Sequence, residues 1–418
     1  MKIYKFGGAS VKNASAVKNL AKIVNQFDDP LVIVVSAMGK TTRALEKLVE
    51  VYFNQESSVH NCIDEIYNSH MQIVEELFPE GHIAYNEIDA IFDELKSKLA
   101  TNPSSTFNFE YDQIVSYGEI ISTTIVNLYL NNFGILSEWV DIRKIIITDA
   151  NYREARVDLE VSEKNAGAYF NNKDLNVFVT QGFLGATSNS HTTTLGLEGS
   201  DYTAALLASF LKAESVTVWK NVPGILNADP KWFDETEKLD KLNYRDAIEL
   251  AFYGASVLHP KTIQPIKQKN IPLFVKSFLD PNTEGTIIGD FEYDKLIPSF
   301  IFKVDQVLIN IHPENLSFIA EENLERIFSI MAKYGLRANL MQNTAVSFRI
   351  CANNDATRVP GVINELSKFY HITIEDNLEL ITIRYYDQAT IERVLVKKEV
   401  LLEQHNNKTV QMVVRKLD

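Results

Sequence analysis

The chain begins with MKIYKFGGAS (residues 1–10), a short alternating strand that runs through a glycine pair into a helical pattern. Because Gly7 and Gly8 have no Cβ, the backbone there can approach a ligand closely, and free amides of the first helical turn would point at it. Lys5 can reach the same place, and the Ser10 hydroxyl can donate to a ligand oxygen or cap the helix. The stretch predicts a phosphate site, although a glycine pair by itself is more often a plain tight turn beside a solvated lysine.

Composition and charge are those of an ordinary globular protein. The 418 residues are 45% hydrophobic, which is enough for a large core divided among two or three domains. The net charge of −14 and the lack of a Lys/Arg run argue against nucleic acid or an acidic membrane as partner. The sequence shows no signal-peptide pattern and no membrane-length apolar run, so we expect a cytoplasmic protein, with Cys62 and Cys351 as buried free thiols.

Apolar strands alternate with helical patterns through residue 290. Leu31–Val35 is a continuous apolar run, typical of a strand buried on both faces of a parallel sheet, and a polar loop with Ser36 and Thr42 follows it. Two helical patterns, in residues 59–77 and 88–99, are expected to form a helical excursion on this sheet. The alternation predicts an α/β fold, an open and mostly parallel sheet in a three-layer αβα arrangement.

Two acidic positions lie within helical patterns further along. Glu119 has apolar neighbours and is either an exposed residue or a ligand to a cationic group. Ser200 and Asp201 begin a helix, where Asp201 could do no more than cap it or complement its dipole. Two helix N-termini, this one and the one after Gly8, can face one polyphosphate.

Spaced motifs along essentially the whole chain resemble those of aspartate kinases, in the amino acid kinase superfamily. In chain order they are KFGGAS (5–10), SA (36–37), SYGE (116–119), TQGF (180–183), TTLG (193–196), GSDYTAA (199–205), VPGI (222–225) and VLHP (257–260). The resemblance implies transfer of phosphate from ATP, with Mg²⁺, to the β-carboxylate of L-aspartate, the entry step to lysine, threonine and methionine synthesis. A carboxylate nucleophile is already ionised at neutral pH, so the chemistry needs positioning and charge neutralisation rather than a general base.

The resemblance also implies roles for individual residues. Lys5 and Asp201 would be catalytic. The aspartate would be held by Thr42, Glu119, residue 197 and Ser200, with Glu119 at its ammonium group. The nucleotide would lie against Lys5, Gly7, Gly8, Ser10, Ser36, Lys220, Asn221, Asp229 and Lys231. No side chain is assigned as a metal ligand.

Two positions depart from the family pattern. Leu197 stands where relatives usually carry an arginine for the substrate's α-carboxylate, and losing one partner of a buried charged pair typically costs about 2–5 kcal/mol. We therefore expect near-normal ATP binding, poor use of aspartate, and recovery of at least about tenfold in Leu197→Arg. Ser256 replaces a common lysine, a smaller loss. The alternative to an active kinase is a regulatory paralogue that binds nucleotide and amino acid with little activity.

The character of the chain changes between residues 290 and 298. We expect a catalytic domain over residues 1–295 and, over 298–418, a ferredoxin-like pair that resembles the tandem ACT regulatory domains of aspartate kinases, the second compact at about 379–418. By resemblance the ACT pair implies a homodimer and an amino-acid effector. Asn339 stands where lysine-sensitive relatives tend to have an aspartate, so a cationic effector would lose an ion-pair partner.

Overall fold

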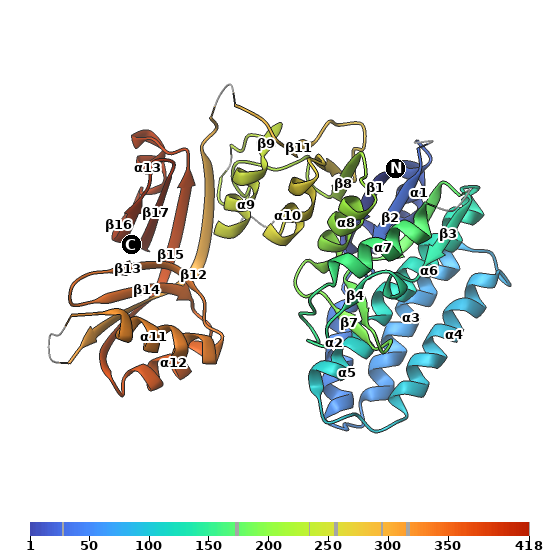
Figure 1. Cartoon of the computed structure of the whole chain (residues 1–418), viewed down its shortest axis with the longest axis horizontal. Coiled ribbons are helices and arrows are strands. Elements are labelled where there is room, and N and C mark those ends of the chain that lie inside the picture. Colours follow the sequence, from blue (N-terminus) through green and yellow to red (C-terminus); the bar gives the residue numbers. More distant parts are fainter. Residues whose placement is uncertain are drawn as a thin grey trace. The chain divides into compact units, whose positions relative to one another are not determined.

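The computed structural model describes residues 1–26, 29–171, 175–233, 235–254, 258–293, 296–314 and 318–417. The chain divides into two compact units, each of which is shown in Figure 1. The first unit comprises residues 1–225, 238–248 and 257–292, and the second comprises residues 226–237, 249–256 and 293–418.

The first unit is built on a mostly parallel sheet, as predicted. Among the described residues, eight strands form this sheet in the order β3-β5-β2-β1-β8-β10-β11-β9, and every neighbouring pair except β10 and β11 is parallel. The strands are β1 (Lys2–Phe6), β2 (Leu31–Val35), β3 (Ser137–Val140), β5 (Val177–Gln181), β8 (Ser215–Lys220), β9 (Lys241–Asn243), β10 (Leu273–Ser277) and β11 (Thr286–Gly289). The central strands β1 and β2 are short and almost completely buried, and burial on both faces explains the continuous hydrophobic run of β2.

Helices cover both faces of this sheet. Alternate residues of the central strands, such as Phe6 and Ile33, pack in one core cluster with α1 (Ala14–Val24) and α6 (Tyr117–Phe133). The other face packs against α8 (Gly199–Phe210), and α7 (Leu159–Phe170) and α10 (Pro260–Gln268) pack on α8. The three-layer αβα prediction is therefore confirmed.

The start of the chain differs in one detail from its prediction. The glycine pair leads into a 3-10 turn, Gly8–Val11, before the first α-helix begins. The side chain of Asn13 caps that helix by accepting a hydrogen bond from the Ala16 amide. The suggestion that Ser10 caps the helix was wrong, because the turn delays the helix by four residues.

A helical excursion and a small sheet complete the first unit. The excursion consists of α2 (Thr41–Phe53), α3 (Val59–Leu77), α4 (Ile83–Leu99) and α5 (Phe107–Val115), which share the core cluster of α1 and α6. The small sheet consists of β4 (Ile147–Thr148), β6 (Leu184–Thr187) and β7 (Thr192–Thr194), and a 3-10 turn, Ile142–Lys144, precedes it. The sequence did not predict this small sheet, because its strands are short and polar.

The second unit contains the predicted ferredoxin-like pair. Within the described residues, six strands form an antiparallel sheet in the order β13-β14-β12-β15-β17-β16. Its elements are β12 (Ser299–Pro313), α11 (Glu321–Tyr334), β13 (Ala338–Asn343), β14 (Phe348–Asn353), α12 (Arg358–Leu366), β15 (Tyr370–Arg384), α13 (Gln388–Val394), β16 (Lys398–His405) and β17 (Thr409–Lys416); α9 (Tyr244–Tyr253) has residues in both units. The two long central strands, β12 and β15, run through both halves of the pair and join them in one sheet.

Two predictions about the whole chain can be compared with the structure. Cys62 and Cys351 are buried and unpaired, as predicted. In the part of the chain that the structure describes, no helix combines the length and apolar character needed to cross a bilayer.

The helical excursion should contribute strongly to stability through Phe92. Its ring is fully buried and meets that of Tyr67 edge to face, with 5.1 Å between the ring centroids. We expect Phe92→Ala to lower the free energy of unfolding by about 3–5 kcal/mol, because it leaves a cavity in this core. Phe252→Ala, at a ring that is 67% exposed, is the matched control. Equal losses for the two variants in urea unfolding would contradict this assignment of the core.

Candidate functional site

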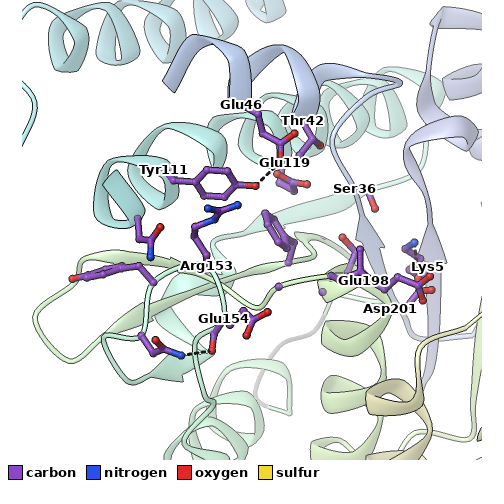
Figure 2. Close-up of a pocket in the computed structure, with 18 of the residues that line it drawn as sticks. Lys5, Ser36, Thr42, Glu46, Tyr111, Glu119, Arg153, Glu154, Glu198 and Asp201 are labelled. Carbon is purple, nitrogen blue, oxygen red and sulfur yellow. Dashed lines mark hydrogen bonds and ion pairs between the residues drawn. The ribbon is translucent and has the colours of Figure 1, made fainter. Parts of the chain in front are cut away.

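A cavity of about 740 Å³ lies in the first unit, at the carboxyl ends of its central strands (Figure 2). The ends of β1, β2 and β8 reach it, together with the starts of α2, α6 and α8 and the loop after β4. The predicted residues that line it are Lys5, Ser36, Thr42, Glu119, Leu197, Ser200, Asp201 and Lys220. Residues that are far apart in the sequence thus line one cavity.

The Lys5 ammonium and the Asp201 carboxylate form a buried ion pair at one end of the cavity. Lys5 Nζ lies 2.5 Å from Asp201 Oδ1, and Lys220 Nζ lies 3.9 Å from Asp201 Oδ2. Asp201 is in the first turn of α8, where the helix dipole favours a negative charge. Burial lowers the pKa of Lys220, against the opposing effect of Asp201. Two cations on one carboxylate leave this end able to accept additional negative charge.

The glycine pair has two different roles. A Cβ on Gly8 would lie 2.7 Å from the carbonyl oxygen of Ala37, so Gly8 is required where two backbone segments touch. A Cβ on Gly7 would lie 3.4 Å from Lys5 Nζ, so its absence leaves space beside that ammonium. The Ser10 hydroxyl is buried and donates to the carbonyl of Trp219 at 3.3 Å. The three residues do not line the cavity in the described part of the chain, and their contact with nucleotide stays a prediction.

Glu119 is a buried carboxyl group beside the cavity. Its Oε1 accepts a hydrogen bond from the Ala37 amide at 3.1 Å, and its Oε2 is buried without a hydrogen-bond partner among the described residues. Burial raises the pKa of Glu119 to about 8, although the Ala37 amide and the charge of Lys5 oppose this shift. An unpartnered buried carboxylate oxygen is suited to a cationic ligand group such as an ammonium, so the alternative of an exposed residue is excluded.

The remaining substrate residues come from two helix starts. Thr42 lies in the first turn of α2 and faces the cavity, as does Ser200 in the first turn of α8. A Cβ on Gly182 would lie 2.4 Å from the Cβ of Ser200, so the glycine of the TQGF motif lets α8 begin directly against β5. The glycine of this motif therefore allows Ser200 to lie close to the end of β5.

Leu197 lines the cavity, but its side chain is 80% exposed. The cost of about 2–5 kcal/mol refers to a buried charged pair, so the loss at this exposed position should be smaller.

Besides Gly7, Gly8 and Ser10, three more predicted nucleotide residues lie outside the cavity lining. Asn221 is exposed directly after β8. Asp229 and Lys231 are exposed in the second unit, where an Asp229 carboxylate oxygen accepts a hydrogen bond from the Lys231 amide at 2.9 Å. Their role stays a prediction. Ser256, the second departure from the family pattern, lies outside the described residues.

The sequence reasoning missed several residues that line the cavity. Arg153 comes from the loop after β4, and its guanidinium lies over the ring of Tyr111, 4.4 Å from the centroid. The Tyr111 hydroxyl donates to Glu46 at 2.7 Å. Glu198 precedes α8, and burial, followed by the negative charge of Asp201, raises its pKa. Glu198 had a signal in the sequence, because it lies three residues before Asp201. Arg153, Tyr111 and Glu46 had none, because their positions depend on a loop and on helix packing.

Comparisons with known proteins identify the family. The model of the amino acid kinase family matches residues 1–277. The chain is 30% identical over 400 residues to lysine-sensitive aspartokinase 3 of Escherichia coli, which covers 91% of this chain and 86% of that protein. The chain belongs to the aspartokinases of the amino acid kinase family. This confirms the resemblance seen in the motifs.

Other relatives add a fold comparison and a limit. The structure of E. coli aspartokinase III in complex with aspartate and ADP is similar with a TM-score of 0.83 and 27% identity, over 99% of this aspartokinase and 96% of that chain. The same enzyme in complex with lysine and aspartate gives a TM-score of 0.84. A bifunctional aspartokinase/homoserine dehydrogenase of Zea mays is 30% identical over 68% of this chain, which spans only 32% of that enzyme.

Glu119 should make the ligand-free protein less stable as the pH rises. The folded group keeps its proton up to about pH 8, whereas the unfolded group ionises near 4.5. Between these values the unfolded chain binds fewer protons, so this group's contribution to the free energy of unfolding falls as the pH increases and levels off above about 8. We expect Glu119→Gln to gain stability relative to the parent between pH 5 and pH 8 in urea unfolding. Exposed Glu50→Gln is the control, and parallel pH profiles for parent and Glu119→Gln would contradict the burial of this charge.

Proposed function

We propose that this aspartokinase transfers the γ-phosphoryl group of ATP to the β-carboxylate of L-aspartate and forms 4-phospho-L-aspartate, the first step toward lysine, threonine and methionine. The observation that carries the proposal is the division of charge within one cavity. The unpartnered Oε2 of Glu119 suits the ammonium group of an amino acid, and the Lys5 and Lys220 cations suit its reacting carboxylate and the phosphates. The similar E. coli enzyme forms a complex with aspartate and ADP, which fits the two ligands proposed here.

The chain's residues would act mainly by position and charge. A β-carboxylate oxygen of aspartate attacks the γ-phosphorus, and the bond from that phosphorus to the bridging oxygen of ADP breaks. The nucleophile is ionised at neutral pH, so no residue needs to remove a proton. Lys5, held by Asp201, lies where it can neutralise the charge on the transferred group, and the amides at the start of α8 add to that field.

The site also fits Mg²⁺ carried by the nucleotide. Glu198 and Asp201 place two carboxylates beside the cavity, and carboxylate oxygens are the ligands that Mg²⁺ prefers. When bound, Mg²⁺ would supply charge neutralisation at the phosphates.

An assay of aspartyl phosphate formation tests the function directly. Hydroxylamine traps the acyl phosphate as a hydroxamate, so the chain is mixed with aspartate, ATP and Mg²⁺ and the hydroxamate is measured. We expect steady formation that requires all three. ATP and aspartate binding without hydroxamate would instead favour the regulatory paralogue, which no feature of the cavity supports better.

Replacement of Lys5 should slow the chemistry more than it weakens binding. If Lys5 neutralises charge that develops in transfer, Lys5→Ala should lower kcat by about 100-fold or more and change the KM for ATP far less. Lys22→Ala, at an exposed lysine of α1, is the control and should match the parent. An increase in the KM for ATP at unchanged kcat would refute this role.

The domain assignments extend to regulation. We assign residues 1–295 to catalysis and 298–418 to tandem ACT domains, the second compact at about 379–418, which would bind an amino-acid effector in a homodimer. The likeness to a lysine-sensitive aspartokinase makes lysine the first candidate. In the second unit, however, Lys303 Nζ donates to Asn339 Oδ1 at 2.9 Å. The Asn339 amide in turn donates at 2.8 Å to Gln306 and to Asn353, so its side chain is fully engaged within the protein.

Lysine should therefore inhibit this aspartokinase weakly or not at all. An internal lysine already occupies the amide oxygen of Asn339, and no carboxylate at this position offers an ion pair to a cationic effector. Initial rates at saturating and sub-saturating aspartate, with lysine in millimolar excess and leucine as control, measure this. Sharp inhibition by micromolar lysine would show that the effector binds by another arrangement.

A further inference from the structure

We propose that Arg153 binds the α-carboxylate of the amino-acid substrate, the role that the family pattern gives to an arginine at position 197. The inference rests on the proposed function. It adds a substrate-binding residue that neither the motifs nor the family pattern points to, and it explains how this chain tolerates Leu197.

The cations in the cavity are unevenly distributed. Of the described residues that line the cavity, three are cationic: Lys5, Lys220 and Arg153. The two lysines lie at Asp201. Arg153 forms no ion pair with any described carboxylate, and its guanidinium lies over Tyr111, on the side of the cavity where Glu119 and Thr42 lie (Figure 2). A guanidinium can bind a carboxylate through two parallel hydrogen bonds, and stacking on an aromatic ring fixes its plane.

The backbone holds Arg153 in an unusual conformation. Its φ angle is +74°, in the left-handed region that side-chain-bearing residues seldom adopt. The cost is offset by buried Asp112, whose carboxylate oxygens accept the Arg153 amide at 3.2 and 3.0 Å. The same carboxylate accepts hydrogen bonds from the amide of Thr194 at 2.9 Å and from its hydroxyl at 2.8 Å. Asp112 thus fastens the Arg153 loop to the strand that leads to Leu197, and a strained residue that faces a cavity is a candidate for function.

The loops that carry Arg153 and Leu197 touch each other. The Ala155 amide donates to the Thr194 carbonyl at 3.0 Å, and a Cβ on Gly196 would lie 3.3 Å from the Arg153 carbonyl oxygen. An arginine at either position therefore starts from nearly the same place on the cavity wall. Arg153 can supply the guanidinium that position 197 lacks.

The chemistry of aspartate explains why this place suits the α-carboxylate. The ammonium and the α-carboxylate are attached to one carbon, so the groups that recognise them must lie close together. With the ammonium at Glu119, a cation on the same side of the cavity meets the α-carboxylate, and the β-carboxylate is left to face Lys5. Arg153 would therefore decide which of the two carboxylates is phosphorylated. With Arg153 in this role, we no longer expect the chain to use aspartate poorly.

Steady-state kinetics of Arg153→Gln test the proposal. We expect kcat/KM for aspartate to fall by about 10- to 100-fold, the range for a lost hydrogen bond to a charged group, while the KM for ATP changes less than about twofold. Arg156→Gln, an exposed arginine of the same loop outside the cavity lining, is the control and should match the parent. β-Alanine, which is aspartate without its α-carboxylate, should be used poorly and equally by parent and Arg153→Gln.

A second pair of variants separates a binding role from a structural one. Arg153→Lys should recover part of the loss, and Leu197→Arg in the Arg153→Gln background should recover at least about tenfold, because it returns a guanidinium to the same region. Unchanged aspartate kcat/KM in Arg153→Gln, or an equal fall with aspartate and β-alanine, would overturn the proposal.

Calorimetric titration with aspartate distinguishes this inference from the proposed function. A parent protein that binds aspartate through Arg153 but forms no hydroxamate would refute the kinase reaction and support the inference. If the parent and Arg153→Gln form hydroxamate at the same rate, the inference is refuted and the kinase reaction is supported.

Discussion

The contact on which the site depends is the ion pair between Lys5 and Asp201. Lys5 is the second-last residue of strand β1 at the centre of the sheet, and Asp201 lies in the first turn of α8, which packs on β1 from one face. Both side chains are almost completely buried, at 10% and 3% exposure, and a buried charge without a partner is costly. Each charge therefore keeps the other in place, and the dipole of α8 adds to the stabilisation of Asp201. Gly8 and Gly182 are required in the same region. A Cβ on Gly8 would collide with the Ala37 carbonyl oxygen, and a Cβ on Gly182 would collide with Ser200.

The opposite side of the cavity has a complementary arrangement. Glu119 is buried, its Oε2 has no hydrogen-bond partner among the described residues, and burial raises its pKa to about 8. An ammonium ligand would stabilise the charged form of Glu119, and this ion pair would contribute to the binding of the substrate. The free protein thus carries a destabilising group that the substrate is suited to neutralise. Substrate recognition and stability are linked through this one side chain.

Much of the fold and of the candidate site could be predicted from the sequence. There are physical reasons why the rest could not be predicted. The apolar run of β2 and the glycine motif after β1 predicted a buried parallel sheet with ligands at its edge, because burial on both faces leaves a strong pattern. The sequence predicted the ferredoxin-like pair but not the two long strands that join it, since β12 and β15 each contain exposed residues that interrupt the apolar pattern. Arg153 could not be found this way. It lies in an irregular loop, and its position depends on contacts with Asp112, 41 residues earlier in the chain, and with the loop at Gly196.

The cavity is proposed to sort the three charged groups of aspartate: ammonium to Glu119, α-carboxylate to Arg153 and β-carboxylate to Lys5. A crystal structure of the chain with L-aspartate and ADP tests this sorting most directly. We expect the α-carboxylate within hydrogen-bonding distance of the Arg153 guanidinium and the β-carboxylate facing Lys5 Nζ. An aspartate bound in the reverse direction, with its α-carboxylate at Lys5 and no contact to Arg153, would contradict it.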